Sequence, residues 1–109
     1  MAFGVAGADI ANPFDGSFVP GTGSGTTAST SKTTNNANDF IIGAIAIDNT
    51  PTVTAGTNFN LVATQAYTNL RENSAEYRVV TATGTYVTSF TLGQTNSWAM
   101  IVDAIRQAS

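Results

Sequence analysis

The sequence predicts an all-β fold, an antiparallel β-sandwich, on the strength of three observations. Apolar and polar side chains alternate in several runs, most cleanly over residues 85–92. The runs recur at about 8–12-residue spacing with Gly, Asn and Thr between them, which is typical of sandwiches and small barrels. Helical periodicity is weaker throughout. A short helix over 99–107 is the one alternative, and a strand is preferred there because both faces are apolar and no helix cap follows.

The first third of the chain predicts two kinds of segment within a single domain, 1–109. Residues 1–20 are expected to form a short strand and then a loop, because Pro13 and Pro20 exclude a central strand. Residues 21–38 are rich in Gly, Ser, Thr and Asn. They form either a flexible linker or an edge strand, since threonines suit an exposed sheet surface.

The more regular part of the sequence begins at residue 39. The stretch DFIIGAIAID, 39–48, is apolar almost throughout and predicts a strand buried on both faces or nearly so. Further strands are expected within 59–67 and 75–84. Gly84, in the stretch TATGTY, supplies a permissive turn position and predicts a hairpin between the runs on either side.

The last strand is expected within residues 96–107, where both faces are apolar. One face carries Trp98, Met100 and Val102, and the other carries Ala99, Ile101 and Ile105, which frame Asp103.

Composition excludes several classes of function. Charged residues make up 10% of the chain, the net charge is −3, and the four basic residues, Lys32, Arg71, Arg78 and Arg106, are scattered. Nucleic-acid binding needs clustered cations, so a nucleic-acid partner is not expected. The chain has no cysteine and no histidine, which excludes a Cys/His zinc site and a Ser-His-Asp relay. We expect no cofactor, and no apolar run approaches the length of a membrane span.

The expected location is extracellular or at a cell surface. A neutral surface rich in hydroxyl and amide groups is common on secreted β-proteins. The N-terminal residues lack the basic start and continuous apolar stretch of a signal peptide. The expectation is therefore that an export signal has been removed, or that the chain is a fragment of a longer protein.

Four stretches resemble a module of bacterial extracellular proteins of unassigned function: AGADIANPFDGS, NANDFIIGAIAI, AEYRVVTATGTYVTSFTL and NSWAMIVDAI. The resemblance covers nearly the whole chain and implies a β-sandwich. It also implies that this chain matches only the C-terminal half of the module, so that a half or reduced sandwich is completed by self-association. An unpaired, uncharged edge is a template for such pairing, which points to edge segments 2–10 and 22–34.

The stretch RENSAEYRVV, 71–80, gathers two arginines and two glutamates, four of the eleven charged residues of the chain. Glu72 and Glu76 share one face of a strand at about 13 Å, wider than the carboxylate separation of glycosidases. The preferred interpretation is that Glu76 and Arg78 face solvent or cross-strand partners, with Arg71 and Glu72 at a turn. A ligand-binding role for these four residues is the alternative.

Two further groups of residues are weaker candidates for binding. Aromatic side chains suited to stacking on a sugar ring are Tyr67, Tyr77, Tyr86 and Trp98, although Trp98 is more typical of a core. Calcium ligands, if any, would come from Asp9, Asn12, Asp15 and Asp39, although these residues also form turns and no EF-hand spacing is present.

Lys32 suggests one covalent possibility. Some surface β-domains carry an amide cross-link between a lysine and an Asn or Asp, promoted by a buried acid. Lys32, Asp103 and Glu76 are the residue types that such a link needs, while the simpler interpretation is a solvated lysine.

The expected function is a non-catalytic structural or interaction module that self-associates, as an oligomer or fibre through edge strands, or packs with other domains. The alternative is a carbohydrate-binding module with a glycan partner. A small carboxylate-based hydrolase that uses Glu72, Glu76 or an Asp pair ranks lowest, because no histidine exists and the carboxylates are dispersed.

Overall fold

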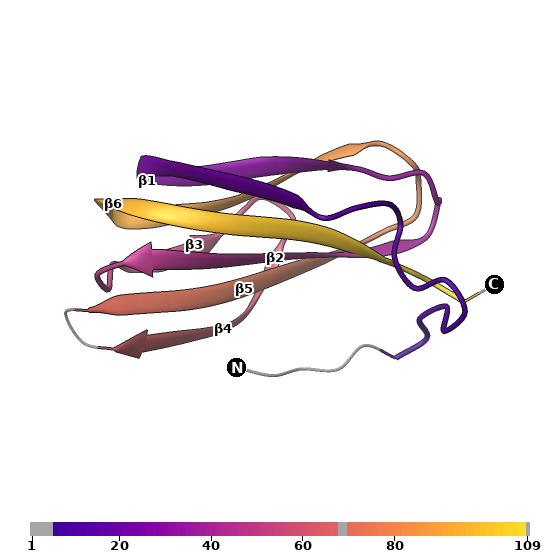
Figure 1. The fold of residues 1–109 in the computed structure, drawn as a ribbon, viewed down its shortest axis with the longest axis horizontal. Coiled ribbons are helices and arrows are strands. Elements are labelled where there is room, and N and C mark those ends of the chain that lie inside the picture. The colour runs from indigo at the N-terminus through magenta and orange to yellow at the C-terminus, as the bar shows by residue number, and fades with distance from the viewer. Residues whose placement is uncertain (1–5, 68–69, 109) are drawn as a thin grey trace.

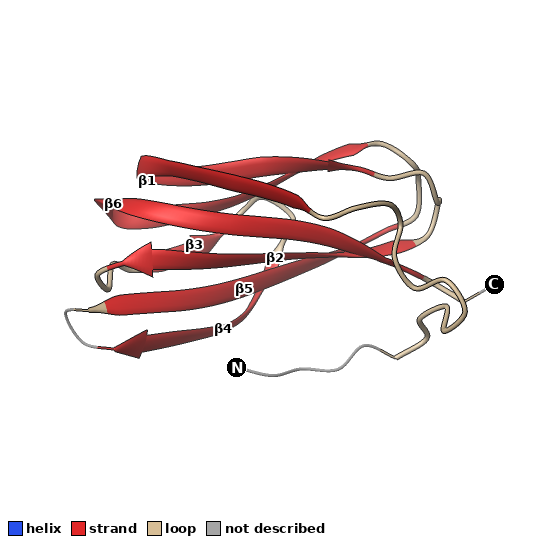
Figure 2. Cartoon of the chain, viewed as in Figure 1, coloured by secondary structure: helices blue, strands red, loops and turns tan. Residues whose placement is uncertain are grey.

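The computed structural model describes residues 6–67 and 70–108. Within them the chain forms six β-strands and no helix: β1 (Val19–Thr33), β2 (Asp39–Asp48), β3 (Val53–Ala55), β4 (Asn60–Tyr67), β5 (Arg71–Val80) and β6 (Thr85–Arg106). All strand pairings are antiparallel, in the order β1-β6-β2-β5-β4, and β3 pairs with β6. The predicted all-β antiparallel fold is confirmed (Figure 2).

The two longest strands, β1 and β6, are bent back on themselves. A straight strand of 22 residues would extend about 73 Å, yet the longest dimension of the molecule is 44 Å. Gly21 and Thr30 lie on the two halves of β1, and a Cβ added to Gly21 would lie 3.3 Å from the Cβ of Thr30. The pairing register slips at this bend, between Gly25 and Thr27. Figure 1 shows both bends at the same end of the molecule.

Because of these bends, a single hydrogen-bonded sheet forms two layers that face each other (Figure 1). The two layers are parts of one sheet and not two separate sheets. The larger layer holds the second half of β6 between β1 and β2, followed by β5 and β4. The smaller layer holds residues 27–33 of β1, residues 85–92 of β6, and β3.

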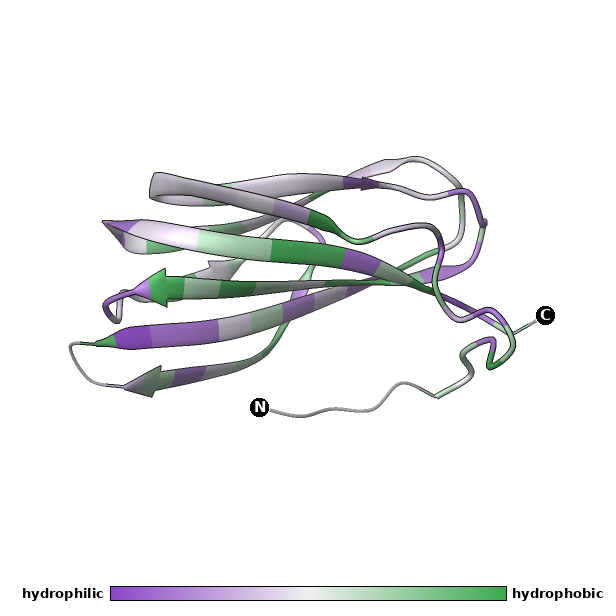
Figure 3. Ribbon diagram, viewed as in Figure 1, coloured by the Kyte–Doolittle hydropathy of each residue, from purple (hydrophilic) through white to green (hydrophobic). Residues whose placement is uncertain are grey.

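The core lies between the two layers. One cluster joins Ala28, Phe90 and Leu92 of the smaller layer to Ile45, Ile47 and Met100 of the larger layer. A second cluster contains Ile41, Phe59, Val80, Val102 and Ala104. Those that lie in β2 and β6 come from alternate positions of the strand, and Figure 3 shows that apolar residues predominate along β2 and the second half of β6.

The predicted hairpin at Gly84 is wrong. β5 pairs with β2 and β4, whereas the strand that follows Gly84 pairs with β1 and β3. Residues 81–84 therefore cross from one layer to the other. The crossing is held by Thr34, whose backbone N–H donates to the Gly84 carbonyl at 2.9 Å and whose Oγ1 accepts the Gly84 N–H at 3.1 Å.

The N-terminal third differs in part from expectation. β1 occupies most of 21–38 as an edge strand, so this stretch is not a flexible linker. Of the strand expected at 2–10, residues 2–5 lie outside the described part, and the rest contributes a single bridge between Ala8 and Gln107. A second bridge joins Phe14 to Ile105, so that the segment before β1 continues along the edge of β6.

Candidate functional site

The larger layer has a second apolar face, on the side away from the core. We call this surface the outer face. It is formed by alternate residues of β2, β5 and β6: Phe40, Ile42, Ala44, Ala46, Ala75, Tyr77, Val79, Ala99, Ile101 and Ile105. Asp103 is the charged residue within this central part of the face.

The outer face is the less buried side of each strand. In β2 the inward positions are all buried, whereas Phe40, Ile42 and Ala44 are half-buried and Ala46 is exposed. Val79 of β5 is 66% exposed. The prediction that residues 39–48 are buried on both faces therefore holds for one face only. The sequence specifies two apolar faces, and the described part of the chain fully buries one of them.

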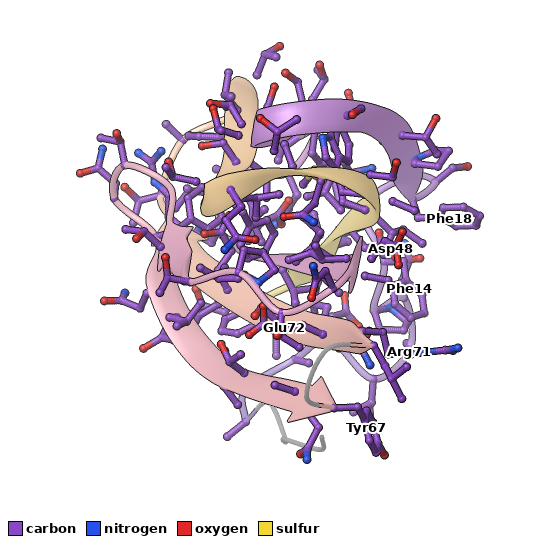
Figure 4. The ribbon with its side chains drawn as sticks, turned by 90° about the vertical axis from the view of Figure 1, so that its left-hand side faces the viewer. Phe14, Phe18, Asp48, Tyr67, Arg71 and Glu72 are labelled. Carbon is purple, nitrogen blue, oxygen red and sulfur yellow. The ribbon has the colours of Figure 1, made fainter. Side chains whose placement is uncertain are left out.

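Aromatic side chains extend this surface. The rings of Phe40 and Tyr77 stack with centroids 5.2 Å apart and planes 11° apart. Phe14 and Phe18, each 55% exposed, project to the same side as Tyr67 and Arg71 (Figure 4). The segment before β1 and the end of β4 thus supply aromatic groups toward two borders of the layer.

A shallow hollow of about 510 Å³ lies at the end of the outer face where β5 begins. Its polar lining comes from Asp48, Arg71, Asn73 and Ser97, and its apolar lining includes Leu70 and Ala99. Asp48 is the register partner of Arg71, so two opposite charges border the hollow. Neutral hydroxyl and amide groups beside them can exchange hydrogen bonds with a polar ligand.

The candidate ligand-binding residues do not form one site. Tyr67, Arg71 and Tyr77 belong to the outer side, whereas Glu72, Glu76, Arg78 and Trp98 point to the inner side. Arg78 lies 4.8 Å from the ring centre of Tyr86. Trp98 packs against the core cluster around Ile47 and lies over Gly23, where an added Cβ would come within 2.7 Å of the indole. The core interpretation of Trp98 therefore fits its position.

The interpretation of Glu76 as a solvent-facing residue is wrong. Its side chain is fully buried, and its Oε2 atom accepts the backbone N–H of Gly56 at 2.8 Å. Burial outweighs the hydrogen bonds from the backbone of Gly56 and Ser89 and raises the pKa of Glu76 to about 7. Burial also raises the pKa of Glu72. The alternation of side chains along β5 assigned its residues to two faces correctly. The face that carries Glu72 and Glu76 is the buried one, although it is the more polar of the two.

This burial argues against the carboxylate-based hydrolase. A glycosidic or ester bond must reach the carboxyl group that cleaves it, and the Glu76 side chain has no exposed surface. Glu72 is 5% exposed.

A third group of charged residues is buried where the segment before β1 meets β1 and β2. Asp15, Lys32 and Asp39 are 5%, 3% and 2% exposed. The simpler interpretation of Lys32 as solvated is therefore wrong. Asp103 and Glu76 are not its partners either: Asp103 lies on the outer face, and Glu76 bonds to Gly56.

Asp15 and Asp39 share a hydrogen bond and titrate together. Burial and the contact with Asp15 raise the pKa of Asp39 to about 6. Burial acts to raise the pKa of Asp15 too. The hydrogen bonds from Asp39 and from the backbone of Asn36 and Asn35 outweigh it, so this pKa lies below its ordinary value. At pH values between the two pKa values, and so below about pH 6, the pair holds one proton, mainly on Asp39.

The calcium candidates are not assembled into a site. Asp9 and Asn12 form a local turn, in which the Asp9 Oδ1 atom accepts the N–H groups of Ala11 and Asn12 at 3.1 Å. Only Asp15 and Asp39 come together. Among residues 6–67 and 70–108, no three acidic side chains lie close enough to hold a metal ion.

Two features escaped the sequence analysis. The apolar residues on both sides of 39–48 and 96–107 are the signal for the outer face, but the same pattern is equally typical of strands that are buried on both faces. The Asp15–Asp39–Lys32 cluster joins residues from three segments, and no local pattern could have indicated it.

Comparison with protein-family models, curated proteins and solved structures finds no match to this chain. The described residues contain no helix long and apolar enough to cross a membrane.

Proposed function

We propose that the chain is a non-catalytic structural module that assembles by packing its outer face against the outer face of a second copy. One observation carries the proposal: β2 and β6 are apolar on both sides, and within residues 6–67 and 70–108 it is the inner side that is fully covered. Monomeric proteins rarely leave a broad apolar face open, and such faces mark interaction sites.

The size of the face supports a partner of the same kind. Five strands about 4.8 Å apart and about 33 Å long present roughly 800 Å², which is what each partner contributes to a standard protein–protein interface. Polar residues of the flanking strands, such as Thr22 and Gln65, border an apolar centre. This is the arrangement of core and rim that interfaces show.

Charge also favours a second copy over a charged partner. Of the seven acidic residues of the chain, only Asp103 lies within the centre of the outer face, and Asp48 lies at its border. A surface with a single central charge offers little to attract a strongly basic or acidic protein, and in a pair of copies the two Asp103 side chains are the charges that the interface must accommodate. Two sheets then pack face to face at about 10 Å, as in a sandwich.

We place this assembly outside the cell or at its surface. The support is the composition, which is low in charge and rich in hydroxyl and amide side chains, and the resemblance of four stretches to bacterial extracellular modules. The half-module implied by that resemblance fits an outer face that another layer should cover.

Light scattering on a sizing column over a concentration series tests the proposal. We expect the mass to rise from that of one chain, 11.2 kDa, to that of two chains as concentration increases. A constant single-chain mass up to millimolar concentration would contradict it.

Carbohydrate binding is the second candidate, and the hollow beside Arg71 favours it. Asp48, Asn73 and Ser97 line the hollow, and the exposed Tyr67 is the register partner of Arg71 at its border. Sugar sites combine an aromatic surface with amide and carboxylate groups in the same way. A glycan screen with the wild type and the Arg71→Ala variant tests this candidate, and a screen without any hit would remove it.

A further inference from the structure

One charged side chain interrupts the central part of the apolar outer face. Asp103 lies two residues from Ile101 and two from Ile105 on β6, and its register partner on β2 is Ile42. Residues two apart on a strand, and residues directly opposite each other on neighbouring strands, point to the same side of a sheet. The neighbours of Asp103 along β6 and across β2 are therefore apolar.

In the single chain the carboxyl group of Asp103 is still open to water. The residue is half-buried, and its Oδ1 atom accepts the backbone N–H of Ala104 at 2.8 Å. A carboxylate has about four sites that accept hydrogen bonds, and water can bind to the others on an open face. The single chain therefore holds a charged Asp103 at little cost.

None of the four basic residues of the chain, all of which the structure describes, is placed to neutralise Asp103. Arg78 and Arg106 occupy inward positions of β5 and β6. Lys32 of β1 is buried, at 3% exposure. Arg71 lies at the far end of the outer face, six positions along the strands and so about 20 Å away.

The other titratable groups of the elements around Asp103 face elsewhere or lie far from it. Those turned inward, or held in the segment before β1, are Asp9, Asp15, Asp39, Glu72 and Glu76. On the outer side, Tyr77 is two strands away, and Asp48 and Tyr67 lie at the far end. Asp103 is thus the acid that a partner on the centre of this face would cover.

Pairing two outer faces would change the surroundings of Asp103. The side chains of two packed sheets interdigitate in a layer about 10 Å thick, so water leaves the apolar centre. A charge that is buried without a partner is costly, and such a group becomes neutral instead. Each copy also brings its own Asp103, so that the pair carries two like charges, and like charges favour the neutral form further.

We propose, building on the outer-face pairing proposed above, that protons on Asp103 control this pairing. Two copies associate tightly when Asp103 is protonated and weakly when it is ionised. The partner is the same in both cases, and the acidity of the surroundings sets how much of the protein is assembled.

The direction of the effect follows from counting protons. The pair holds more protons than two separate chains do, so association strengthens as the pH falls. With one carboxyl group in each copy, the dissociation constant can fall by at most about 100-fold for each pH unit. We expect the Kd of the wild type at about pH 5 to be at least about 10-fold lower than at about pH 8.

Sedimentation equilibrium of the wild type at a series of pH values and constant ionic strength tests the proposal. A Kd that stays constant, or that rises as the pH falls, would overturn the control by Asp103 and leave the outer face as the interface. This outcome needs no variant. If the wild type and the Asp103→Asn variant both remain single chains at every pH, the pairing itself is wrong, and the control by Asp103 with it.

Asp103→Asn removes the titrating group and keeps an acceptor for the Ala104 N–H. Its Kd should not change with pH and should be close to that of the wild type in acid. Asp48→Asn is the matched control, because it removes the same charge from the border of the face. It should keep the pH dependence of the wild type. An Asp103→Asn variant that also keeps this dependence would overturn the proposal, because another group would then be the cause.

Discussion

The Oε2 atom of Glu76 accepts the Gly56 N–H at 2.8 Å inside the molecule, while its Oε1 atom finds no partner among the described residues. Thr88 beside it is also fully buried, and its hydroxyl is unpaired among those residues. A carboxyl group in this position is more stable in its neutral form, because desolvation penalises the charged form.

Glu76 should make stability depend on pH. Its pKa is about 7 in the folded chain, against 4.5 for the ordinary group. The folded state therefore holds its proton more tightly, and the stability present below about pH 4.5 is lost as the pH rises through about 7. The free energy of unfolding should fall by about 3 kcal/mol over this range. Urea unfolding at several pH values measures it.

Glu76→Gln is the matched control for this titration, because the amide keeps an acceptor for Gly56. We expect it to flatten the pH dependence and to exceed the wild type in stability above about pH 8. The pKa of Asp39 is also raised, to about 6, so the free energy of unfolding of this variant should still fall slightly as the pH rises. A variant that follows the wild-type curve at every pH would refute the assignment to Glu76.

Gly43 is required by close packing between the layers. A Cβ at this position would clash with the Thr88 Cγ2 atom and would lie 3.6 Å from the Glu76 Cγ atom. Gly43→Ala should therefore cost about 1–3 kcal/mol through overpacking. Gly84→Ala is the control, because its nearest contacts are at an ordinary 3.7 Å. Equal melting temperatures for the two variants would contradict the packing of β2 on β6.

Thr34 should be the residue that holds the crossing between layers. Thr34→Val keeps the shape but leaves the Gly84 N–H without its side-chain acceptor, which should cost about 1–3 kcal/mol. Thr34→Ser keeps the hydroxyl, so its free energy of unfolding should fall clearly less than that of Thr34→Val. Denaturant unfolding of the two variants compares them. If Thr34→Ser proved as unstable as Thr34→Val, the hydrogen bond to Gly84 would not be the cause.

Local pattern was enough to predict much of the fold. The alternation of Trp98, Met100 and Val102 against Ala99, Ile101 and Ile105 separated the two faces of β6 correctly. It could not show that β6 continues through Gly93 and bends, because a glycine between two strands is equally typical of a turn. Nor could it show that β5 and the strand after Gly84 have different partners, since strand pairing depends on contacts distant in the sequence.

The candidate site was harder to predict for a related reason. Period-two alternation assigns Glu72 and Glu76 to one face but does not say which face is inside. Their charge suggested solvent, whereas the chain buries them between the layers and leaves Val79 exposed. The apolar outer positions of β2 carried the signal for an interaction surface. Only the structure shows that the described part of the chain leaves these positions half-buried or exposed.

The central claim is that the outer face binds a second copy of the chain. Sedimentation of the Ile101→Lys and Val87→Lys variants beside the wild type tests it most directly. Both residues are exposed on β6, 40% and 58% respectively, but Val87 lies in the smaller layer, away from the outer face. We predict that Ile101→Lys stays a single chain while Val87→Lys self-associates like the wild type. If Ile101→Lys assembles as the wild type does, the outer face is not the interface, and pairing through the edge strand β1 becomes the explanation to test.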